Sequence, residues 1–426
     1  MFTKIGLKNF RTHKDSEIEL DDTTLLIGSN NSGKSNFFSG LHYFSRLVSL
    51  SNPDRGNPKF QNNRPNVSTE LKGNNYFPQK HSLSKEDEPI GFSCEWSLYQ
   101  TKITYTLSIY PDLMFEIINC REVLELVSPN YNEIHTNGVE SPATRLDLRK
   151  IIKNSNSKRK DIIADFFQNL SSFYYYNFQP SFLKGEGIPL VFFGGKKQPA
   201  TKKNYIKEFR ETNWYPNIPS EIGKEGSNLQ DVLAYIKEYE EETYHRFFGY
   251  LKRFVKNFNG LIIKDGELKW QFDMGGSNFP FYEPDKISDG IVKAAAVALL
   301  CSLKNPPALI LLEEVENGIN QKKLSEFLSW LTNASDNSTK TQFILSSHSP
   351  SVIREFSNKL DFVYNIHLRE RDYVSKLTNL NDAIKPLVDM GTIQEDSTIK
   401  RNGKDVIQIK PYHLIELFYN GVLGEL

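Results

Sequence analysis

Cysteine is scarce in this sequence, which has three in 426 residues. Cys94, Cys120 and Cys301 lie far apart and form no CxxC pair. This spacing argues against a zinc ribbon and against the disulfide framework of a secreted protein. The first four residues do not begin a signal peptide either. The sequence therefore predicts a cytoplasmic protein in a reducing compartment.

Long apolar runs and an excess of one charge are also missing. The longest apolar runs cover residues 294–301 and 308–312, far short of the ~20 residues that a membrane span needs. Lysine plus arginine and aspartate plus glutamate both number 52, so no overall positive field attracts the chain to nucleic acid. We expect no membrane contact, and any contact with DNA has to be local or supplied by a partner.

The length and composition are those of a folded protein with more than one domain. At about 150 residues per domain, the chain corresponds to two or three domains. Two polar stretches, residues 51–89 and 194–226, interrupt the folded pattern, and the first has the composition of a disordered segment. Glutamates interleave with the lysines of the second stretch, which favours a solvated loop over a nucleic-acid patch. The sequence has no fixed-period repeat and no run of heptads long enough for a coiled-coil arm.

Strand and helix patterns alternate along the chain as in an α/β protein. Residues 90–128 alternate apolar and polar side chains and predict an antiparallel meander. The last third alternates helix and strand, which predicts a parallel core sheet. The other expected elements are three strands within residues 2–27, a helix running toward residue 169, a helix pair at 228–259, a strand pair around 266, helices from 289, 321 and 349, and strands from 308 and 342.

A phosphate-binding loop is predicted near the N-terminus. Gly28 to Ser35 matches GxxxxGK[ST], between the apolar strand 25–27 and a helix that begins near Lys34. In such a loop, backbone N–H groups surround the β-phosphate and the helix N-terminus adds its dipole. Lys34 would reach the β- and γ-phosphates and Ser35 would bind Mg²⁺. The nucleotide-binding candidates are Gly28, Ser29, Asn30, Asn31, Ser32, Gly33, Lys34 and Ser35.

Two adjacent carboxylates follow a second buried strand. Residues 308–312 are apolar and are followed by Glu313 and Glu314. In isolation this pattern equally fits a strand that ends at a solvated acidic turn. Beside a phosphate loop, a parallel sheet would deliver both carboxylates to the nucleotide. Glu313 would then hold Mg²⁺ through water, and Glu314 would polarise the attacking water.

A histidine ends a third buried strand. His348 follows the apolar run that starts at Gln342, one helical crossover after Glu314. A lone histidine is usually structural, but here it should emerge on the neighbouring strand at the same sheet edge. This position favours a sensor of the γ-phosphate.

The start of an apolar helix carries a weaker signal. Ser288 and Asp289 precede a helix that is apolar on all sides, so one of them is expected to be its N-cap. A helix N-terminus with an exposed serine and with Gly290 also suits an anion. The two interpretations are compatible.

Taken together, these motifs resemble those of ABC-type ATPases. Residues 28–35, 288–290, 309–314 and His348 look like the Walker A, signature, Walker B and switch-histidine motifs. The chain is most similar to the RecF, SMC and OLD-like branch of AAA-annotated ATPases, in compact form without a coiled coil. Further stretches that carry the resemblance are residues 5–10, 30–36, 173–182, 226–229 with 232–233, and 414–426.

The resemblance implies a fold, a cofactor and an assembly. The expected fold is a P-loop head with a mixed N-terminal β lobe, a parallel core sheet and a helical lobe that carries the signature motif. Two heads would form a homodimer, or a larger oligomer built from it, around ATP and Mg²⁺. Ser288, Asp289 and Gly290 of one subunit would contact the nucleotide of the other. Asn36 would join the nucleotide site, and Gln179 is the candidate for a glutamine-loop ligand of Mg²⁺.

Three positions depart from the pattern of the class. Glu313 stands where the wider class usually has aspartate, and Val315 replaces a proline. Asn320 replaces a histidine or aspartate. This change affects how the two nucleotide sites of a dimer communicate, and it indicates slow turnover.

The resemblance also implies domain limits. The expected ATPase core comprises residues 1–50 and 286–426, with the β meander at 90–128. A helical lobe at 142–285 would contain the polar insertion 194–226, and residues 51–89 would form another insertion.

Three functions are weighed for this head. The leading one is an ATPase switch in DNA repair or anti-phage defence, acting with a protein effector such as a nuclease. The alternative is an ATP-gated scaffold that restrains the effector with little turnover. A nuclease within the chain is discounted, because the acidic residues after His348 show no DxD arrangement: Asp361, Glu370, Asp372, Asp382 and Asp389.

Overall fold

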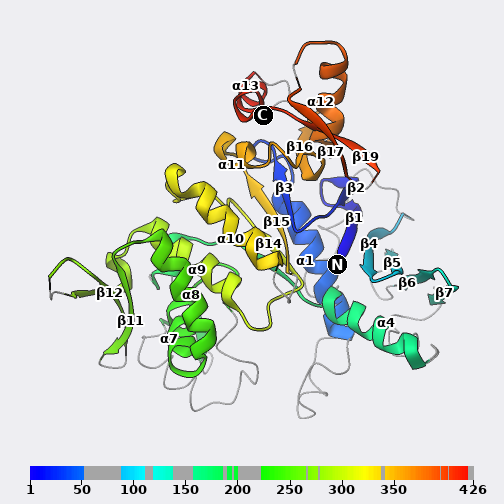
Figure 1. Cartoon of the computed structure of the whole chain (residues 1–426). Helices are drawn as coiled ribbons and strands as arrows, with labels where there is room; N and C mark the ends of the chain where they lie inside the picture. Colours follow the sequence, from blue (N-terminus) through cyan, green and yellow to red (C-terminus); the bar gives the residue numbers. More distant parts are fainter. Residues whose placement is uncertain are drawn as a thin grey trace. The chain divides into compact units, whose positions relative to one another are not determined.

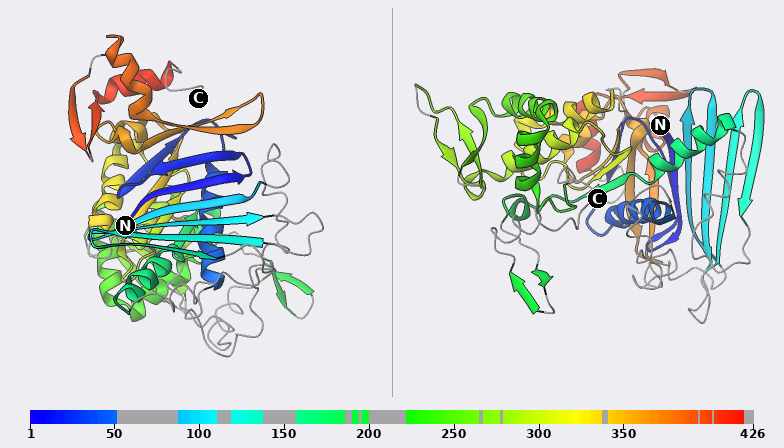
Figure 2. Two further views of the ribbon diagram at one scale, coloured as in Figure 1. Left: turned by 90° about the vertical axis from the view of Figure 1, so that its right-hand side faces the viewer. Right: turned by 90° about the horizontal axis from the view of Figure 1, so that it is seen from below.

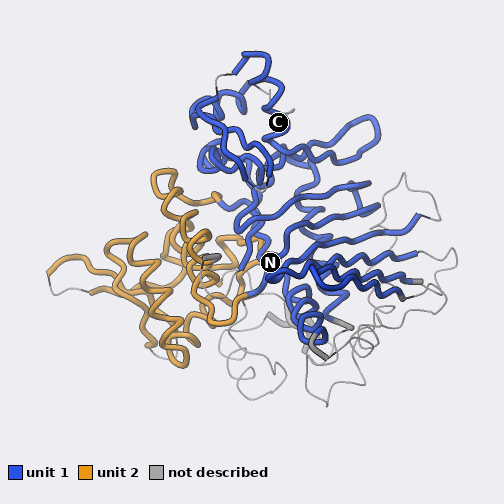
Figure 3. Tube along the Cα trace, turned by 45° about the vertical axis from the view of Figure 1, so that its right-hand side comes forward, with its two compact units in different colours: residues 1–175, 307–315, 340–426 blue, residues 176–306, 316–339 orange. Residues whose placement is uncertain are grey.

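The chain forms two compact units in the computed structural model (Figure 3). Unit 1 comprises residues 1–175, 307–315 and 340–426, and unit 2 comprises residues 176–306 and 316–339. The domain limits expected from the sequence stay a prediction. The structure describes residues 1–51, 88–110, 119–137, 157–185, 190–193, 196–199, 222–264, 267–276, 279–336, 341–393, 395–401 and 403–420.

Unit 1 begins with a six-stranded sheet in the order β2-β1-β4-β5-β6-β7 (Figure 2). Its described strands pair only in the antiparallel sense, and this sheet contains the meander expected at 90–128. Side chains of β5 alternate between buried and partly exposed, as in a sheet with one face in the core. The strands are β1 (Phe2–Phe10), β2 (His13–Glu19), β4 (Ile90–Leu98), β5 (Thr101–Tyr110), β6 (Asn119–Ser128) and β7 (Tyr131–Asn137).

Aromatic side chains fill the core between this sheet and two helices. Helix α1 (Lys34–Ser51) and helix α4 (Ser157–Leu170) both contribute to the cluster. Phe44 of α1 stacks on Phe92 with ring centroids 5.1 Å apart and on Tyr105 at 6.0 Å. Offset or edge contacts between aromatic rings add to the burial of their area, so this cluster anchors α1, and with it the loop before α1.

The second sheet of unit 1 has the order β17-β16-β3-β15-β14-β8. Strands β14, β15, β3 and β16 pair in parallel, and β17 pairs antiparallel with β16 at the edge. All residues of β3, β14 and β15 are buried, as expected for strands covered on both faces. The predicted α/β class with a parallel core is thus confirmed. The strands are β3 (Thr23–Ile27), β8 (Phe173–Tyr176), β14 (Leu309–Leu312), β15 (Gln342–Ser347), β16 (Val363–Arg369) and β17 (Val374–Asn379).

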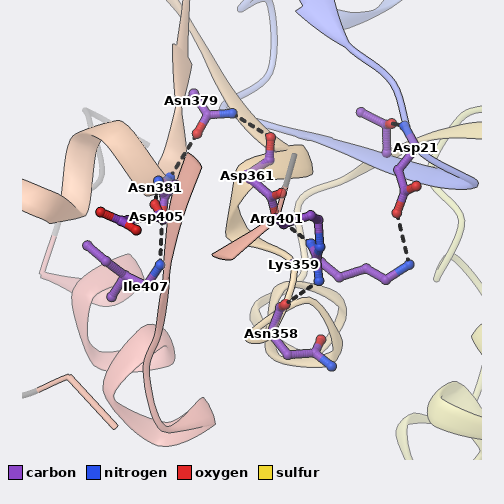
Figure 4. Close-up of polar contacts among 10 residues, drawn as sticks. Asp21, Asn358, Lys359, Asp361, Asn379, Asn381, Arg401, Asp405 and Ile407 are labelled. Atoms are coloured by element: carbon purple, nitrogen blue, oxygen red, sulfur yellow. Dashed lines mark hydrogen bonds and ion pairs between the residues drawn. The ribbon is translucent and has the colours of Figure 1, made fainter. Parts of the chain in front are cut away.

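The C-terminal part of unit 1 is attached to this sheet by polar contacts (Figure 4). Arg401 Nη1 donates to Asp361 Oδ1 at 2.7 Å, and the Asn379 amide donates to the Asp361 carbonyl at 2.7 Å. The Asn381 side chain bonds two residues of one C-terminal strand: its Nδ2 donates to the Asp405 carbonyl at 3.1 Å, and its Oδ1 accepts from Ile407 N at 2.8 Å. The elements here are α11 (Pro350–Glu355), η5 (Leu360–Phe362), α12 (Leu380–Asp389), the hairpin β18 (Ser397–Arg401) and β19 (Lys404–Gln408), and α13 (Pro411–Tyr419).

Unit 2 packs helices against a small antiparallel sheet (Figure 1). Helix α9 (Asp289–Ser302) is buried from Val292 onward, which agrees with its apolar sequence. Tyr250, Phe254 and Trp330 form an aromatic cluster beside it. The other elements are α5 (Pro180–Leu183), the hairpin β9 (Leu190–Phe193) and β10 (Lys196–Pro199), α7 (Leu229–Tyr239), α8 (Glu241–Phe254), β11 (Phe258–Lys264), β12 (Glu267–Phe272), β13 (Phe281–Tyr282), η3 (Pro284–Lys286), η4 (Gln321–Lys323) and α10 (Leu324–Asp336).

Some expectations fall on residues outside the described part. These are most of the polar stretches 51–89 and 194–226, the first half of the helix expected before residue 169, and residues 421–426 of the C-terminal resemblance. Among the described helices, none is both long and apolar enough to cross a membrane.

Candidate functional site

The phosphate loop joins β3 to α1, as the motif predicts. Gly28 has φ 144° and Gly33 has φ 114°, a region that disfavours other residues. A Cβ on Gly28 would lie 2.0 Å from the Ile366 carbonyl oxygen, and one on Gly33 would lie 2.2 Å from Ser375 Oγ. Both glycines are therefore required by the backbone and by the space around it.

The Lys34 ammonium is held by the loop. Its Nζ donates to the carbonyl oxygens of Gly28 and Ser29, both at 2.8 Å, and lies 3.4 Å from Ser32 Oγ. Lys34 is buried, with 6% of its surface exposed, so its positive charge lies inside the loop and is little screened by solvent. A buried cation beside the N-terminus of α1 fits the phosphates of a nucleotide, because both features favour negative charge.

Residues distant in sequence support the loop from outside. Ser375 Oγ lies 2.6 Å from the Ser32 carbonyl oxygen, and His13 Nε2 lies 2.9 Å from the Gly33 carbonyl oxygen. Arg11 Nη1 donates to Asn36 Oδ1 at 3.2 Å, so Asn36 is held directly after the motif. Sequence reasoning singled out Asn36 but missed Arg11, His13 and Ser375, because no local pattern marks them.

The ends of three strands meet at one edge of the core sheet. In the register, Leu312 of β14 is opposite Leu345 of β15, and Ser347 of β15 is opposite Ile27 of β3. The residues that follow are Glu313, His348 and Gly28, so all three leave the sheet at the same edge. The prediction that β14 and β15 are neighbours is therefore confirmed.

Glu313 is buried and has a tyrosine partner. Its side chain is 5% exposed, and the Tyr175 hydroxyl hydrogen-bonds it. Burial, and then the Glu313 charge, raise the pKa of Tyr175, so the phenol remains a donor. The aromatic cluster at 173–176 marks this strand in the sequence, but nothing there identifies Tyr175 as the partner of an acid.

Glu314 lies in a left-handed turn. Its φ is 45°, which is uncommon for a residue with a side chain and costs about 1–2 kcal/mol. The N–H of Glu314 donates to Ser346 Oγ at 3.2 Å, and the N–H of Val315 donates to the Ser346 carbonyl at 3.2 Å. These bonds to β15 stabilise the turn, and such local strain is frequent at functional sites.

His348 lies in a short turn between β15 and α11. Ser347 Oγ accepts from the N–H of Ser349 at 2.9 Å, and Ser349 Oγ accepts from the N–H of Ser351 at 3.3 Å, capping α11. Two serine hydroxyls thus fix the backbone on the C-terminal side of His348.

The signature residues begin α9 in unit 2. Ser288 is exposed and occupies the N-cap position, as expected, but its side chain makes no capping hydrogen bond. Asp289 pairs with Lys184 at 2.7 Å. A Cβ on Gly290 would lie 2.4 Å from the Gly318 carbonyl oxygen, so the close approach of two backbones requires this glycine.

Gln179 also belongs to unit 2. It precedes α5, and its Nε2 donates to Asn177 Oδ1 at 2.9 Å. Its role as a ligand of Mg²⁺ stays a prediction.

Solved SMC head structures are similar to the chain at low identity. The SMC head domain from Thermotoga maritima is 15% identical with a TM-score of 0.38, over 89% of this chain and 98% of that one. An SMC head bound to the C-winged helix domain of ScpA is 12% identical with a TM-score of 0.44, over 88% and 97%. An SMC head with an extended coiled coil, bound to the C-terminal domain of ScpA derived from Pyrococcus furiosus, is 14% identical with a TM-score of 0.39, over 92% and 99%.

Family models match most of the chain. A model described as "AAA domain, putative AbiEii toxin, Type IV TA system" matches residues 193–354. Comparison with curated proteins gave no match. A model described as "AAA ATPase domain" matches residues 1–213, half of the 426 residues and including the whole phosphate loop. The chain therefore belongs to the AAA ATPase domain family.

Proposed function

We propose that this ATPase is a Mg²⁺-dependent switch that dimerises on ATP and hydrolyses it. One observation carries the proposal: the phosphate loop, the Glu313–Glu314 pair and His348 follow three adjacent parallel strands at one sheet edge. Ligands of open α/β sheets bind at the carboxyl ends of the strands, so these groups are available to one nucleotide.

The arrangement supports a role for each residue. Lys34 would bind the β- and γ-phosphates, and Ser35 and Glu313 would hold Mg²⁺, Glu313 through water. Bound Mg²⁺ would neutralise charge on the phosphates. Glu314 would orient and polarise the attacking water, and His348 would contact the γ-phosphate. Gln179 is our candidate for a further Mg²⁺ ligand.

The exposed start of α9 supports the proposed dimerisation. Ser288 and Asp289 are exposed, and the helix N-terminus favours an anion. In a two-fold dimer, Ser288 and the Gly290 N–H of each subunit would contact the γ-phosphate bound by the other. ADP lacks this phosphate, so hydrolysis would release the contact, which makes ATP a switch.

The biological setting is anti-phage defence or DNA repair. The description of the family model over residues 193–354 names a putative toxin of a toxin–antitoxin system, which supports defence. The effector would be another polypeptide, such as a nuclease, because the chain carries no net charge that attracts DNA by itself.

Light scattering tests the dimerising switch. The Glu314→Gln protein with ATP and Mg²⁺ should double in mass, and adding Ser288→Arg should prevent this. Ser325→Arg places the same charge on an exposed serine of α10 and should leave the doubling intact. A mass that does not depend on ATP, or that Ser288→Arg does not change, contradicts the proposal.

Phosphate release tests the hydrolysis step. Wild-type protein should release phosphate, and Lys34→Ala should lose both ATP binding and release. ATP-dependent doubling of the wild type without release, alone or with DNA, would favour a scaffold over an enzyme.

A further inference from the structure

Strand β17 reaches the phosphate loop from the opposite end of the chain. We propose that Ser375 of β17, together with Thr12, is a positioning residue that orients the Gly33 N–H toward the phosphates of the nucleotide. This proposal rests on the proposed function, because it assigns Ser375 a role in nucleotide affinity at the same site.

Ser375 is held tightly against the loop. It is 1% exposed, and its Oγ lies 2.6 Å from the Ser32 carbonyl oxygen and 2.8 Å from Thr12 Oγ1. Its backbone N–H donates to the Thr12 carbonyl at 2.8 Å, and its register partner in β16 is Leu368. Two backbones therefore fix the position of the hydroxyl.

The direction of the hydrogen bonds follows from the chemistry of the groups. The Ser32 carbonyl oxygen can only accept, so Ser375 Oγ donates to it. The same hydroxyl hydrogen is shared with Thr12 Oγ1, which also accepts from Asn36 Nδ2 at 3.1 Å. The result is a connected network of Asn36, Thr12 and Ser375 against the loop, and bonds in such a network strengthen one another.

The carbonyl of Ser32 shares a peptide plane with the N–H of Gly33. In a trans peptide these two groups point in opposite directions. Because Ser375 holds the carbonyl on the side of β17, the N–H of Gly33 is directed to the other side. His13 holds the next peptide in the same way, because its Nε2 bonds the Gly33 carbonyl and the N–H of Lys34 is opposite.

The consequence concerns nucleotide affinity. Phosphate loops bind the β-phosphate through backbone N–H groups, whose direction determines the strength of each bond. Without the Ser375 hydroxyl, the buried Ser32 carbonyl loses this donor and the peptide is free to rotate. ATP and ADP should be affected equally, because both carry the β-phosphate.

The test compares nucleotide affinity in matched variants. Ser375→Ala leaves the Ser32 carbonyl without this donor, and Thr12→Val leaves the Ser375 hydroxyl and the Asn36 amide without the oxygen that holds them. Each should weaken binding of fluorescent ATP and ADP analogues roughly 5- to 100-fold, the cost of leaving a buried polar group unsatisfied. Thr12→Ser keeps the hydroxyl and should bind within about twofold of wild type. Thr378→Val, on the same strand but without a contact to the loop, is the control.

Kinetics and a double variant separate positioning from a general loss of stability. The KM for ATP should rise in Ser375→Ala, with kcat at saturation within about threefold, because the catalytic groups remain in place. The double variant Ser375→Ala, Thr12→Val should bind the nucleotides only slightly more weakly than either single variant, because both changes interrupt the same hydrogen-bond network.

Two results would overturn the inference. In the first, Ser375→Ala or Thr12→Val is folded and binds both nucleotides with wild-type affinity, while Lys34→Ala does not bind them. In the second, Thr12→Ser binds the nucleotides as weakly as Thr12→Val does. If Ser375→Ala does not fold, the Thr12 pair decides the question. Failure of wild type to bind ATP would instead remove the proposed function.

Discussion

The Tyr175 hydroxyl hydrogen-bonds the carboxylate of Glu313: Tyr175 lies in β8, and Glu313 directly follows β14, the neighbouring strand of the core sheet. A buried carboxylate needs such partners, since burial without them is costly. The bond also orients Glu313, which we assign to the water shell of Mg²⁺. Loss of a group that hydrogen-bonds a metal ligand typically costs about 10- to 100-fold in metal affinity or activity. We therefore propose Tyr175 as a positioning residue for Glu313.

Tyr175→Phe should raise the Mg²⁺ concentration needed for hydrolysis by about 10- to 100-fold. The ring remains packed against Phe38, at 5.8 Å between centroids, so the fold should persist. Phosphate release over a Mg²⁺ titration measures the effect. Tyr364→Phe is the control, because its hydroxyl accepts from the Glu19 N–H at 2.9 Å and is not bonded to the acid pair. An unchanged Mg²⁺ requirement in Tyr175→Phe would show that the bond does not act on the metal.

The two glutamates should differ when each is changed to glutamine. Glu314→Gln should retain ATP and lose about two to four orders of magnitude in hydrolysis, because water positioning and base assistance disappear together. Glu313→Gln should instead raise the Mg²⁺ concentration needed for hydrolysis, because it removes a charged group assigned to the metal. Single-turnover phosphate release and retention of labelled ATP measure both. If Glu313→Gln traps ATP while Glu314→Gln remains active, the assigned roles are reversed.

Gly290→Ala should destabilise the protein by about 1–3 kcal/mol, because the new Cβ meets a backbone carbonyl 2.4 Å away. Gly249→Ala in α8 is the matched control. It also changes a helical glycine of unit 2, but a Cβ there has nothing within 4 Å, so helix propensity should stabilise it by up to ~1 kcal/mol. Urea unfolding of both variants gives the comparison. An equal change in the free energy of unfolding in the two variants would contradict the role of the Gly318 contact.

The groups at the sheet edge could be predicted from sequence because each has a local signal. Apolar runs that end at Gly28, Glu313 and His348 indicate buried strands, and parallel strands end at a common edge. Ser375 has no such signal. Its strand is short and mixed in composition, and its contact is made with a loop 343 positions earlier in the chain.

Backbone strain and side-chain partners also could not be predicted from the sequence. The positive φ of Glu314 results from hydrogen bonds to Ser346, which depend on the pairing of β14 with β15. Similarly, the choice of Tyr175 from the cluster at 173–176 depends on the position of β8 beside β14. Local propensity does not contain this tertiary information.

The last prediction concerns pH and the C-terminal part of unit 1, which Arg401 attaches to Asp361 (Figure 4). Burial raises the pKa of Asp361 above its ordinary value of 3.8, although the charge and hydrogen bond of Arg401 act in the opposite direction. Removing Arg401 should therefore raise this pKa further. An acid with a raised pKa in the folded state binds more protons when folded, so stability falls as pH rises through that pKa.

Arg401→Met should accordingly differ least from wild type at acid pH, as Asp361 becomes protonated, and be less stable by about 1–3 kcal/mol near pH 7, where the carboxylate has lost its charged donor. Urea unfolding at several pH values between these limits measures the difference. Lys404→Met removes the exposed pair with Glu19 and should shift stability by no more than ~1 kcal/mol, because exposed ion pairs contribute little. If the difference for Arg401→Met is the same at both ends of the range, lost packing of the arginine side chain is its cause, and the ionisation of Asp361 does not control the attachment.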